Sequence, residues 1–138
     1  MQGGGTNGSW EAGVLWGFLH YGDPKDFEYD VISGVSVGAF STYVGTHYEK
    51  GEELAFSEKL SDFWSSLDTY TLYEQENLLQ VFKHQLLNER NSLYDNSKAW
   101  DYVRGLEFPN KDIMRRFSIT ALDLNSGHRQ FFNQDNID

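Results

Sequence analysis

Residues 31–39 read Val31-Ile32-Ser33-Gly34-Val35-Ser36-Val37-Gly38-Ala39, which sets one serine between two glycines directly after an apolar, β-branched run. This is the G-x-S-x-G pattern of a nucleophile elbow, a sharp turn from strand to helix that exposes a serine Oγ at the helix N-terminus. Gly34 and Gly38 suit such a turn because a side chain there would collide with the neighbouring strand and helix. The same short pattern also occurs in turns without chemistry, so its interpretation depends on its surroundings.

The residues on either side of Ser36 have the periodicity that an elbow requires. Val31 and Ile32 predict a buried strand before the turn, and Phe40 and Val44 recur at helical spacing after it. The serine therefore lies where a nucleophile would be presented.

A second glycine cluster precedes the first expected helix and reads Gly3-Gly4-Gly5-Thr6-Asn7-Gly8. As G-x-G-x-x-G it could be a dinucleotide fingerprint, with Glu28 or Asp30 as its acidic residue, but that motif follows a strand and only two residues precede these glycines. The alternative is an oxyanion hole, in which residues without side chains aim backbone N–H groups at one developing negative charge. Only the oxyanion interpretation accounts for both glycine clusters together.

The order and spacing of these motifs resemble the patatin-like phospholipase family, in which a glycine-rich loop, a helix with E-A-G-V-L and a strand ending in G-x-S-x-G follow one another. The matching segments are residues 3–8, 11–15 and 30–39, and residues 119–127 resemble a later A-T-D-L-N-T-G segment of the family. The resemblance implies an α/β fold, a patatin-like three-layer α/β/α sandwich.

The resemblance also implies roles for individual residues. Ser36 would be the nucleophile of a serine–aspartate dyad. The oxyanion hole would be lined by the glycine loop together with the amide that follows the serine, which are Gly3, Gly4, Gly5 and Val37. Gly8, Gly34 and Gly38 would be the remaining motif glycines.

The catalytic aspartate is the main departure from the family pattern. In the family it belongs to a later D-G-G or D-G-A motif, and no Asp-Gly pair occurs in these 138 residues. Asp123 is followed by Asn125-Ser126-Gly127, which is typical of a turn. A triad of Ser36, Asp123 and His128 has the chain order of an α/β-hydrolase but no independent support.

We therefore expect residues 1–138 to form a partial patatin-like domain that lacks the first strand and the C-terminal Asp-Gly-Gly/Ala segment. It would be truncated at both ends, and its catalytic aspartate would not be present in the chain.

Composition limits the partners and the compartment. With 11 basic and 21 acidic residues the net charge is −10, which argues against nucleic acid and against electrostatic binding to anionic membranes. A lipid or acyl-ester substrate, or peripheral contact with a membrane, would need apolar contacts. There is no cysteine, and no apolar run approaches the roughly 18 residues of a membrane-spanning helix. The start of the chain lacks the pattern of a signal peptide, so we expect an intracellular protein, and no motif requires a metal or cofactor.

Apolar spacing and helix-ending residues predict the remaining elements, a succession of helices between two strand regions. The apolar stripes of the later helices are read as core rather than as lipid-binding surface. The expected helices are 8–21, 52–67, 76–88 and 97–104, and the expected later strands are 117–124 and 129–133.

Three functions are compatible with these observations. The favoured one is a serine lipid acyl hydrolase whose aspartate base lies outside this chain. The second is a catalytically inactive patatin-like module that binds lipid or protein, and the third is a nucleotide-binding module built on the glycine loop.

Overall fold

The computed structural model describes residues 1–67 and 97–137, and the chain divides into two compact units. The first unit comprises Met1–Ser65 with Phe108–Asp138, and the second comprises Ser66–Glu107. The helix expected at 76–88 lies outside the described residues.

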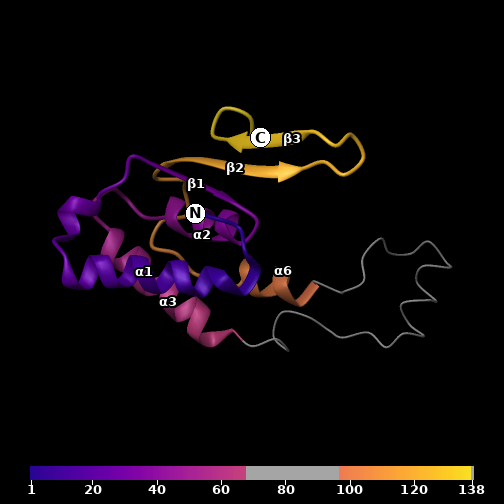
Figure 1. The fold of residues 1–138 in the computed structure, drawn as a ribbon. Coiled ribbons are helices and arrows are strands. Elements are labelled where there is room, and N and C mark those ends of the chain that lie inside the picture. Colours follow the sequence, from indigo (N-terminus) through magenta and orange to yellow (C-terminus); the bar gives the residue numbers. More distant parts are fainter. Residues whose placement is uncertain (68–96, 138) are drawn as a thin grey trace. The chain divides into compact units, whose positions relative to one another are not determined.

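The first unit begins with a single turn of 3-10 helix that leads directly into a long α-helix (Figure 1). Its elements, in chain order, are η1 (Gly5–Asn7), α1 (Gly8–Tyr21), η2 (Pro24–Phe27), β1 (Val31–Val35), α2 (Val37–Thr46), α3 (Glu53–Ser66), β2 (Arg116–Leu122) and β3 (Arg129–Asn133).

Several expected boundaries are confirmed. The helix 8–21 and the strand 129–133 have the expected bounds, and α3 is one residue shorter at each end than the expected 52–67. The strand expected at 117–124 ends two residues earlier, at Leu122, because the next residue starts a turn.

In the second unit the described helix is α6 (Ser97–Arg104), as expected. Gly105 closes it by donating its backbone N–H to the carbonyl oxygens of Asp101 and Tyr102, at 3.0 and 3.1 Å.

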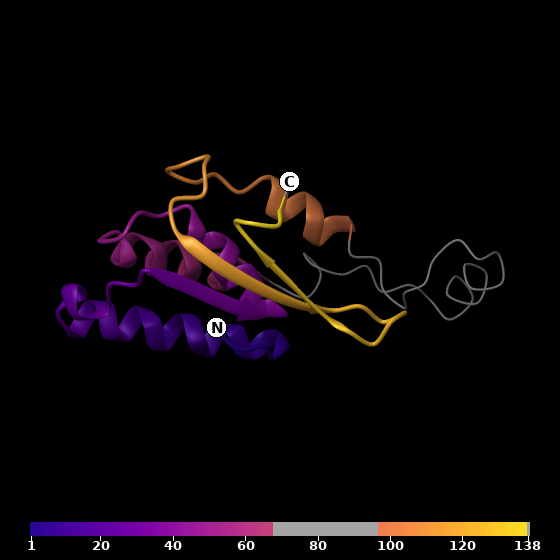
Figure 2. The ribbon, with the colours of Figure 1, turned by 90° about the horizontal axis from the view of Figure 1, so that it is seen from above.

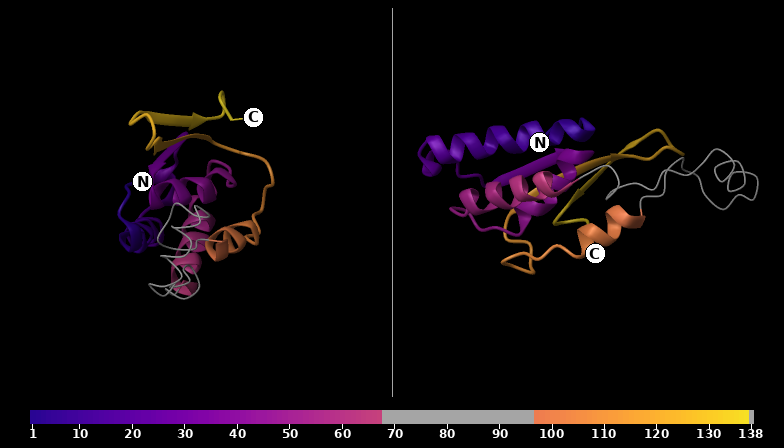
Figure 3. Two further views of the ribbon diagram at one scale, coloured as in Figure 1. Left: turned by 90° about the vertical axis from the view of Figure 1, so that its right-hand side faces the viewer. Right: turned by 90° about the horizontal axis from the view of Figure 1, so that it is seen from below.

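Three strands form one mixed sheet with the order β1-β2-β3 (Figures 1 and 2). β1 and β2 are parallel, with Ile32 opposite Phe117 and Val35 opposite Thr120, whereas β2 and β3 form an antiparallel hairpin. α1 runs alongside β1, at the edge away from β2 (Figure 2; Figure 3, right). This arrangement leaves the elbow and the end of β2 at the same edge of the sheet.

One apolar core joins the sheet to its helices. It contains residues from α1, β1, α2, α3 and β2, together with Tyr48 after α2, and the helices lie below the sheet in the left panel of Figure 3. The buried members are Ala12, Leu15, Leu19, Ile32, Val44, Tyr48, Phe56, Leu60 and Phe117.

The expected α/β class is confirmed. A Cβ on Gly34 would point at α2, 2.5 Å from Thr42 Oγ1, and Ile32 joins the core on the same face of β1. On the opposite face Val31 and Val35 are 56% and 43% exposed. Within the described part of the first unit, the helices therefore cover one face of the sheet.

A buried ion pair connects Arg115, directly before β2, to Glu53, the first residue of α3. Arg115 and Glu53 are 6% and 1% exposed, and Nη1 of the arginine lies 2.9 Å from Oε1 of the glutamate, without the alignment of a hydrogen bond. Glu53 also accepts the backbone N–H groups of Tyr29 and Gly51, and Arg115 donates to the carbonyl oxygen of Tyr48. Nothing in the local sequence pattern predicted this pair.

Candidate active site

Ser36 joins β1 to α2 and occupies a strained backbone conformation. Its φ and ψ are 56° and −126°, and it is the one residue other than glycine with positive φ in the described ranges 1–67 and 97–137. Such conformations cost about 1–3 kcal/mol and persist where surrounding structure enforces them, which occurs most often at functional sites. The residue is exposed, so the turn presents its hydroxyl at the N-terminus of α2.

The two motif glycines beside Ser36 are required by close backbone contacts. A Cβ on Gly34 would collide with the carbonyl oxygen of Gly38, so the strand and the helix could not approach each other. A Cβ on Gly38 would lie 2.5 Å from the carbonyl oxygen of Met1 and 2.8 Å from that of Gln2. The elbow glycines therefore allow contact both within the turn and with the N-terminal segment.

The glycine loop is brought against Ser36 by the fold. A Cβ on Gly3 would lie 3.0 Å from the Cβ of Ser36 and 3.2 Å from the carbonyl oxygen of Val35. Gly5 has φ +58°, a backbone conformation that favours glycine. The two glycine clusters, which are distant in the sequence, thus meet at one place.

Val37 is the first residue of α2, so its N–H group has no partner within that helix. Ser36, the Val37 N–H group and the glycine loop therefore lie together at the N-terminus of α2.

Gly8, the last glycine of the loop motif, has a packing role. It is buried at the start of α1, and a Cβ there would overlap the indole ring of Trp64 and lie 3.1 Å from Cγ1 of Val37. α1, α2 and α3 therefore approach each other at this glycine, which fixes the direction in which the loop enters α1.

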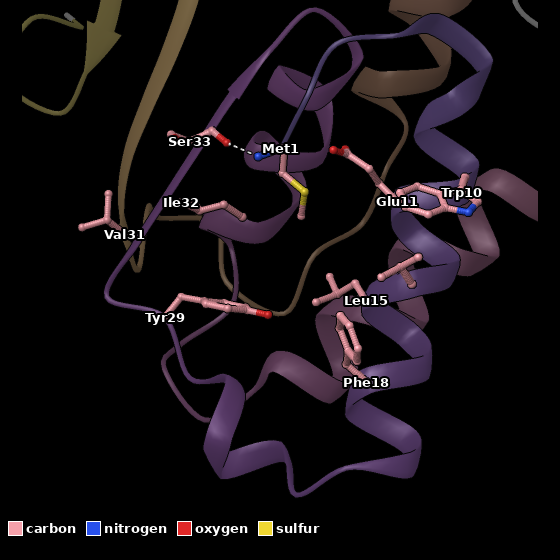
Figure 4. A pocket seen from close by; sticks show the side chains of 10 residues that line it. Met1, Trp10, Glu11, Leu15, Phe18, Tyr29, Val31, Ile32 and Ser33 are labelled. Atoms are coloured by element: carbon pink, nitrogen blue, oxygen red, sulfur yellow. Dashed lines mark hydrogen bonds between the residues drawn. The ribbon is translucent and has the colours of Figure 1, made fainter.

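An open groove of about 450 Å³ lies between α1 and β1 (Figure 4). Its walls are mainly apolar and include Leu15, Phe18 and Ile32. At one end the Met1 amino group donates to the carbonyl oxygen of Ser33 at 2.8 Å, and the carboxylate of Glu11 points toward Met1 (Figure 4). Ser36 does not line this groove.

Asp123 is engaged in the turn between β2 and β3. Its carboxylate accepts the Asn125 backbone N–H at 2.9 Å and the Ser126 hydroxyl at 2.6 Å. The Ser126 hydroxyl, followed by the Asn125 amide, holds the pKa of this carboxyl below its ordinary value. A general base is more effective when its pKa lies near the working pH, so this environment favours a structural role.

The register of the sheet also separates Asp123 from the elbow. Thr120 is opposite Val35, so Asp123 lies three residues beyond that level, about 10 Å along the strand direction. Among the described residues, neither Asp123 nor His128 makes a hydrogen bond with Ser36.

Two histidines, His47 and His20, pack against aromatic rings. His47 is 7% exposed and stacks on Phe108 with ring centroids 4.2 Å apart, while its Nδ1 pairs with the carbonyl oxygen of Asn110. His20 stacks on Trp16 at 3.8 Å. His84 lies outside the described residues.

Sequence analysis included Glu11 in the E-A-G-V-L segment but gave it no role in this region. Its Oε1 accepts the backbone N–H of Gln2 at 2.6 Å, immediately before the glycine loop. The available signal was that Glu11 is the one acidic residue of the otherwise apolar α1.

The described residues contain neither a candidate metal cluster nor a candidate membrane-spanning helix. No group of histidine, aspartate and glutamate side chains in ranges 1–67 and 97–137 could hold a metal ion. None of the helices in that part of the chain has the length and apolar character needed to cross a bilayer.

An α/β fold that presents a strained serine at a strand-to-helix turn is an arrangement that serine hydrolases use, and comparison with known proteins identifies the family of this chain. The family model described as patatin-like phospholipase matches residues 1–137. The chain therefore belongs to the patatin-like phospholipase family, whose members are generally lipid acyl hydrolases. No curated protein and no solved structure gives a significant match.

Proposed function

We propose that Ser36 is the nucleophile of a serine lipid acyl hydrolase. The observation that carries this proposal is the pairing of a strained, exposed serine at a helix N-terminus with a glycine loop packed against its Cβ. Membership of the patatin-like family supplies the reaction class.

In the proposed reaction the Ser36 Oγ attacks the carbonyl carbon of a lipid ester and its proton passes to a carboxylate base. The negative charge that develops on the carbonyl oxygen is stabilised by backbone N–H groups of Gly4, Gly5 and Val37. Collapse of this intermediate releases the alcohol, which takes up the proton, and leaves the acyl group on Ser36. Water then attacks the acyl-enzyme and releases the fatty acid.

Besides the Ser36 nucleophile, this chain contributes the N–H groups of the loop and of α2 to the proposed reaction. Loss of one oxyanion donor typically costs roughly 2.7–4 kcal/mol of transition-state stabilisation. The base is proposed to be an aspartate outside residues 1–138, because the carboxylate of Asp123 is held by its own turn.

Apolar contact is the proposed way in which the substrate is reached. The chain carries a net charge of −10, which disfavours attraction to anionic headgroups. Trp10 and Phe18, which line the open groove between α1 and β1, are 72% and 54% exposed, and tryptophan suits the boundary between lipid and water.

Binding to zwitterionic vesicles should therefore persist at high salt in a sedimentation assay.

A fluorophosphonate ester probe tests the nucleophile in the full-length protein. We expect covalent labelling at Ser36, located by peptide mass spectrometry, and complete loss of labelling in Ser36→Ala. Ser33→Ala is the matched control, because Ser33 is an exposed serine on β1, the strand that leads to Ser36, and it should label as the wild type does. Undiminished labelling of Ser36→Ala would sink the assignment.

A catalytically inactive module is the second candidate, because no described residue that could act as the general base makes a hydrogen bond with Ser36. It predicts vesicle binding without probe labelling. The hydrolase proposal predicts both, so the two assays on one preparation separate the candidates.

A further inference from the structure

We propose that Glu11 is a positioning residue that holds the glycine loop against Ser36 by binding the backbone amide of Gln2. The inference rests on the proposed function of Ser36. It assigns to the first turn of α1 a part in forming the oxyanion hole.

The contact is short. Oε1 of Glu11 accepts the Gln2 N–H at 2.6 Å. Glu11 belongs to a helix of 14 residues whose core face is buried, so the acceptor is fixed relative to the fold. Figure 4 shows the carboxylate directed from α1 toward the N-terminal segment.

Gln2 is the residue through which this contact reaches the site. It directly precedes Gly3, which lies against Ser36, and the carbonyl oxygen of Gln2 would lie only 2.8 Å from a Cβ on Gly38. The backbone of Gln2 is therefore bound to α1 through its N–H, and its carbonyl oxygen lies close to Gly38 of the elbow. A shift of this residue would move the loop amides relative to the ester oxygen.

The remaining carboxylate oxygen shows that the position is costly. Oε2 of Glu11 is buried and has no hydrogen-bond partner among the described residues. Burying a polar atom without a hydrogen-bond partner lowers the stability of the fold. Features that lower stability in this way are expected at functional sites. An apolar side chain would suit the surrounding groove better if stability alone determined the residue.

A carboxylate in the first turn of a helix also interacts favourably with the helix dipole, which is the structural alternative. The two explanations make opposite predictions for two small substitutions. Glu11→Gln keeps an oxygen acceptor at the same reach but removes the charge, whereas Glu11→Asp keeps the charge but withdraws the carboxylate from Gln2 by one methylene.

The experiment compares the rates at which Ser36 is labelled by the fluorophosphonate probe in the full-length protein. We expect Glu11→Gln to label near the wild-type rate and Glu11→Asp to label about tenfold more slowly, less than the roughly 10²–10³-fold loss for deleting an oxyanion donor. With an ester substrate, kcat should fall in Glu11→Asp while KM is unchanged, because the loop acts on the transition state. Glu58→Gln, an exposed glutamate on α3, is the control and should match the wild type.

Equal rates in wild type and Glu11→Asp would overturn the inference, as would a larger loss in Glu11→Gln than in Glu11→Asp. If the wild type itself does not label, the proposed function fails, and hydrogen exchange of the Gln2 amide then decides the contact by itself. Protection that is lost in Glu11→Asp and kept in Glu11→Gln supports the positioning contact, and unchanged protection overturns it.

Discussion

The backbone of Ser36 illustrates a conflict between stability and chemistry at a single residue. With φ at 56° and ψ at −126° the serine occupies a region that residues with a Cβ rarely adopt. The neighbouring strand, helix and N-terminal segment enforce this conformation through contacts that only glycine allows at residues 34 and 38. The strain is compensated by those contacts, and its consequence is an exposed hydroxyl at a helix N-terminus.

Replacing Ser36 by glycine should relieve this strain. Glycine normally destabilises relative to alanine by about 0.5–1 kcal/mol, but here the sign should reverse because glycine tolerates positive φ. We expect Ser36→Gly to be more stable than Ser36→Ala by about 1–2 kcal/mol, measured by urea unfolding. A lower stability for Ser36→Gly would show that the backbone at this residue is not strained.

Asp123 predicts an acid-sensitive hairpin. Its pKa is lowered by the Ser126 hydroxyl and the Asn125 amide, so the folded turn favours the charged carboxylate. That contribution is fully present above the ordinary carboxyl pKa, about 3.9, and is lost as the pH falls through the lowered folded value. Hydrogen exchange of β3 should show loss of protection on acidification in the wild type and a weaker pH dependence in Asp123→Asn. An equal dependence in both proteins would contradict the assignment.

At the scale of elements, α1 is a helix whose apolar pattern does not indicate which face is buried. The helix is apolar on nearly all sides, so its periodicity does not select a buried face. In the fold, Ala12, Leu15 and Leu19 enter the core, whereas Trp10 and Phe18 remain largely exposed. Packing against the strand and the other helices therefore determines which face of α1 is buried.

Two glycines of α1 should respond in opposite ways to the same substitution. Gly17→Ala adds a Cβ with nothing within 4 Å and should stabilise the helix by about 0.5–1 kcal/mol. Gly8→Ala adds a Cβ that overlaps the Trp64 ring and should destabilise by about 1–3 kcal/mol. Urea unfolding of both variants measures the difference. The cost of Gly8→Ala should shrink when Trp64 is also replaced by leucine, and an unchanged cost would contradict the contact.

At the scale of the molecule, the buried pair of Glu53 and Arg115 joins parts of the chain that are far apart in sequence. The glutamate binds amides before β1 and before α3, and the arginine binds carbonyls after α2. Because β2 begins directly after Arg115, the pair helps to place β2 beside β1 and thereby sets the register near the elbow.

Removing one partner of this pair should be severely destabilising. Arg115→Met leaves the Glu53 carboxylate buried without its counter-charge, and such changes typically cost about 3–5 kcal/mol. Lys50→Met is the control, because Lys50 pairs with Asp30 at the exposed surface and should change the free energy of unfolding little. Similar effects of the two substitutions in urea unfolding would mean that the buried pair does not hold the fold together.

The sequence by itself determined the elements near Ser36 and their order. The strand, the elbow and the following helix could be predicted because β-branched residues, glycines and apolar periodicity act over only a few neighbouring residues. The same local signals gave the bounds of α1 and β3, and two glycine motifs with their spacing were enough to indicate the family.

Only the tertiary structure placed Gly3 against Ser36, tied Gln2 to Glu11, selected the buried face of α1 and paired Glu53 with Arg115. Most of these contacts join residues that are distant along the chain. The buried face of α1 was selected from several faces that are similarly apolar. Their energies depend on burial and on close approach of backbones, which exist only once the sheet and helices have packed.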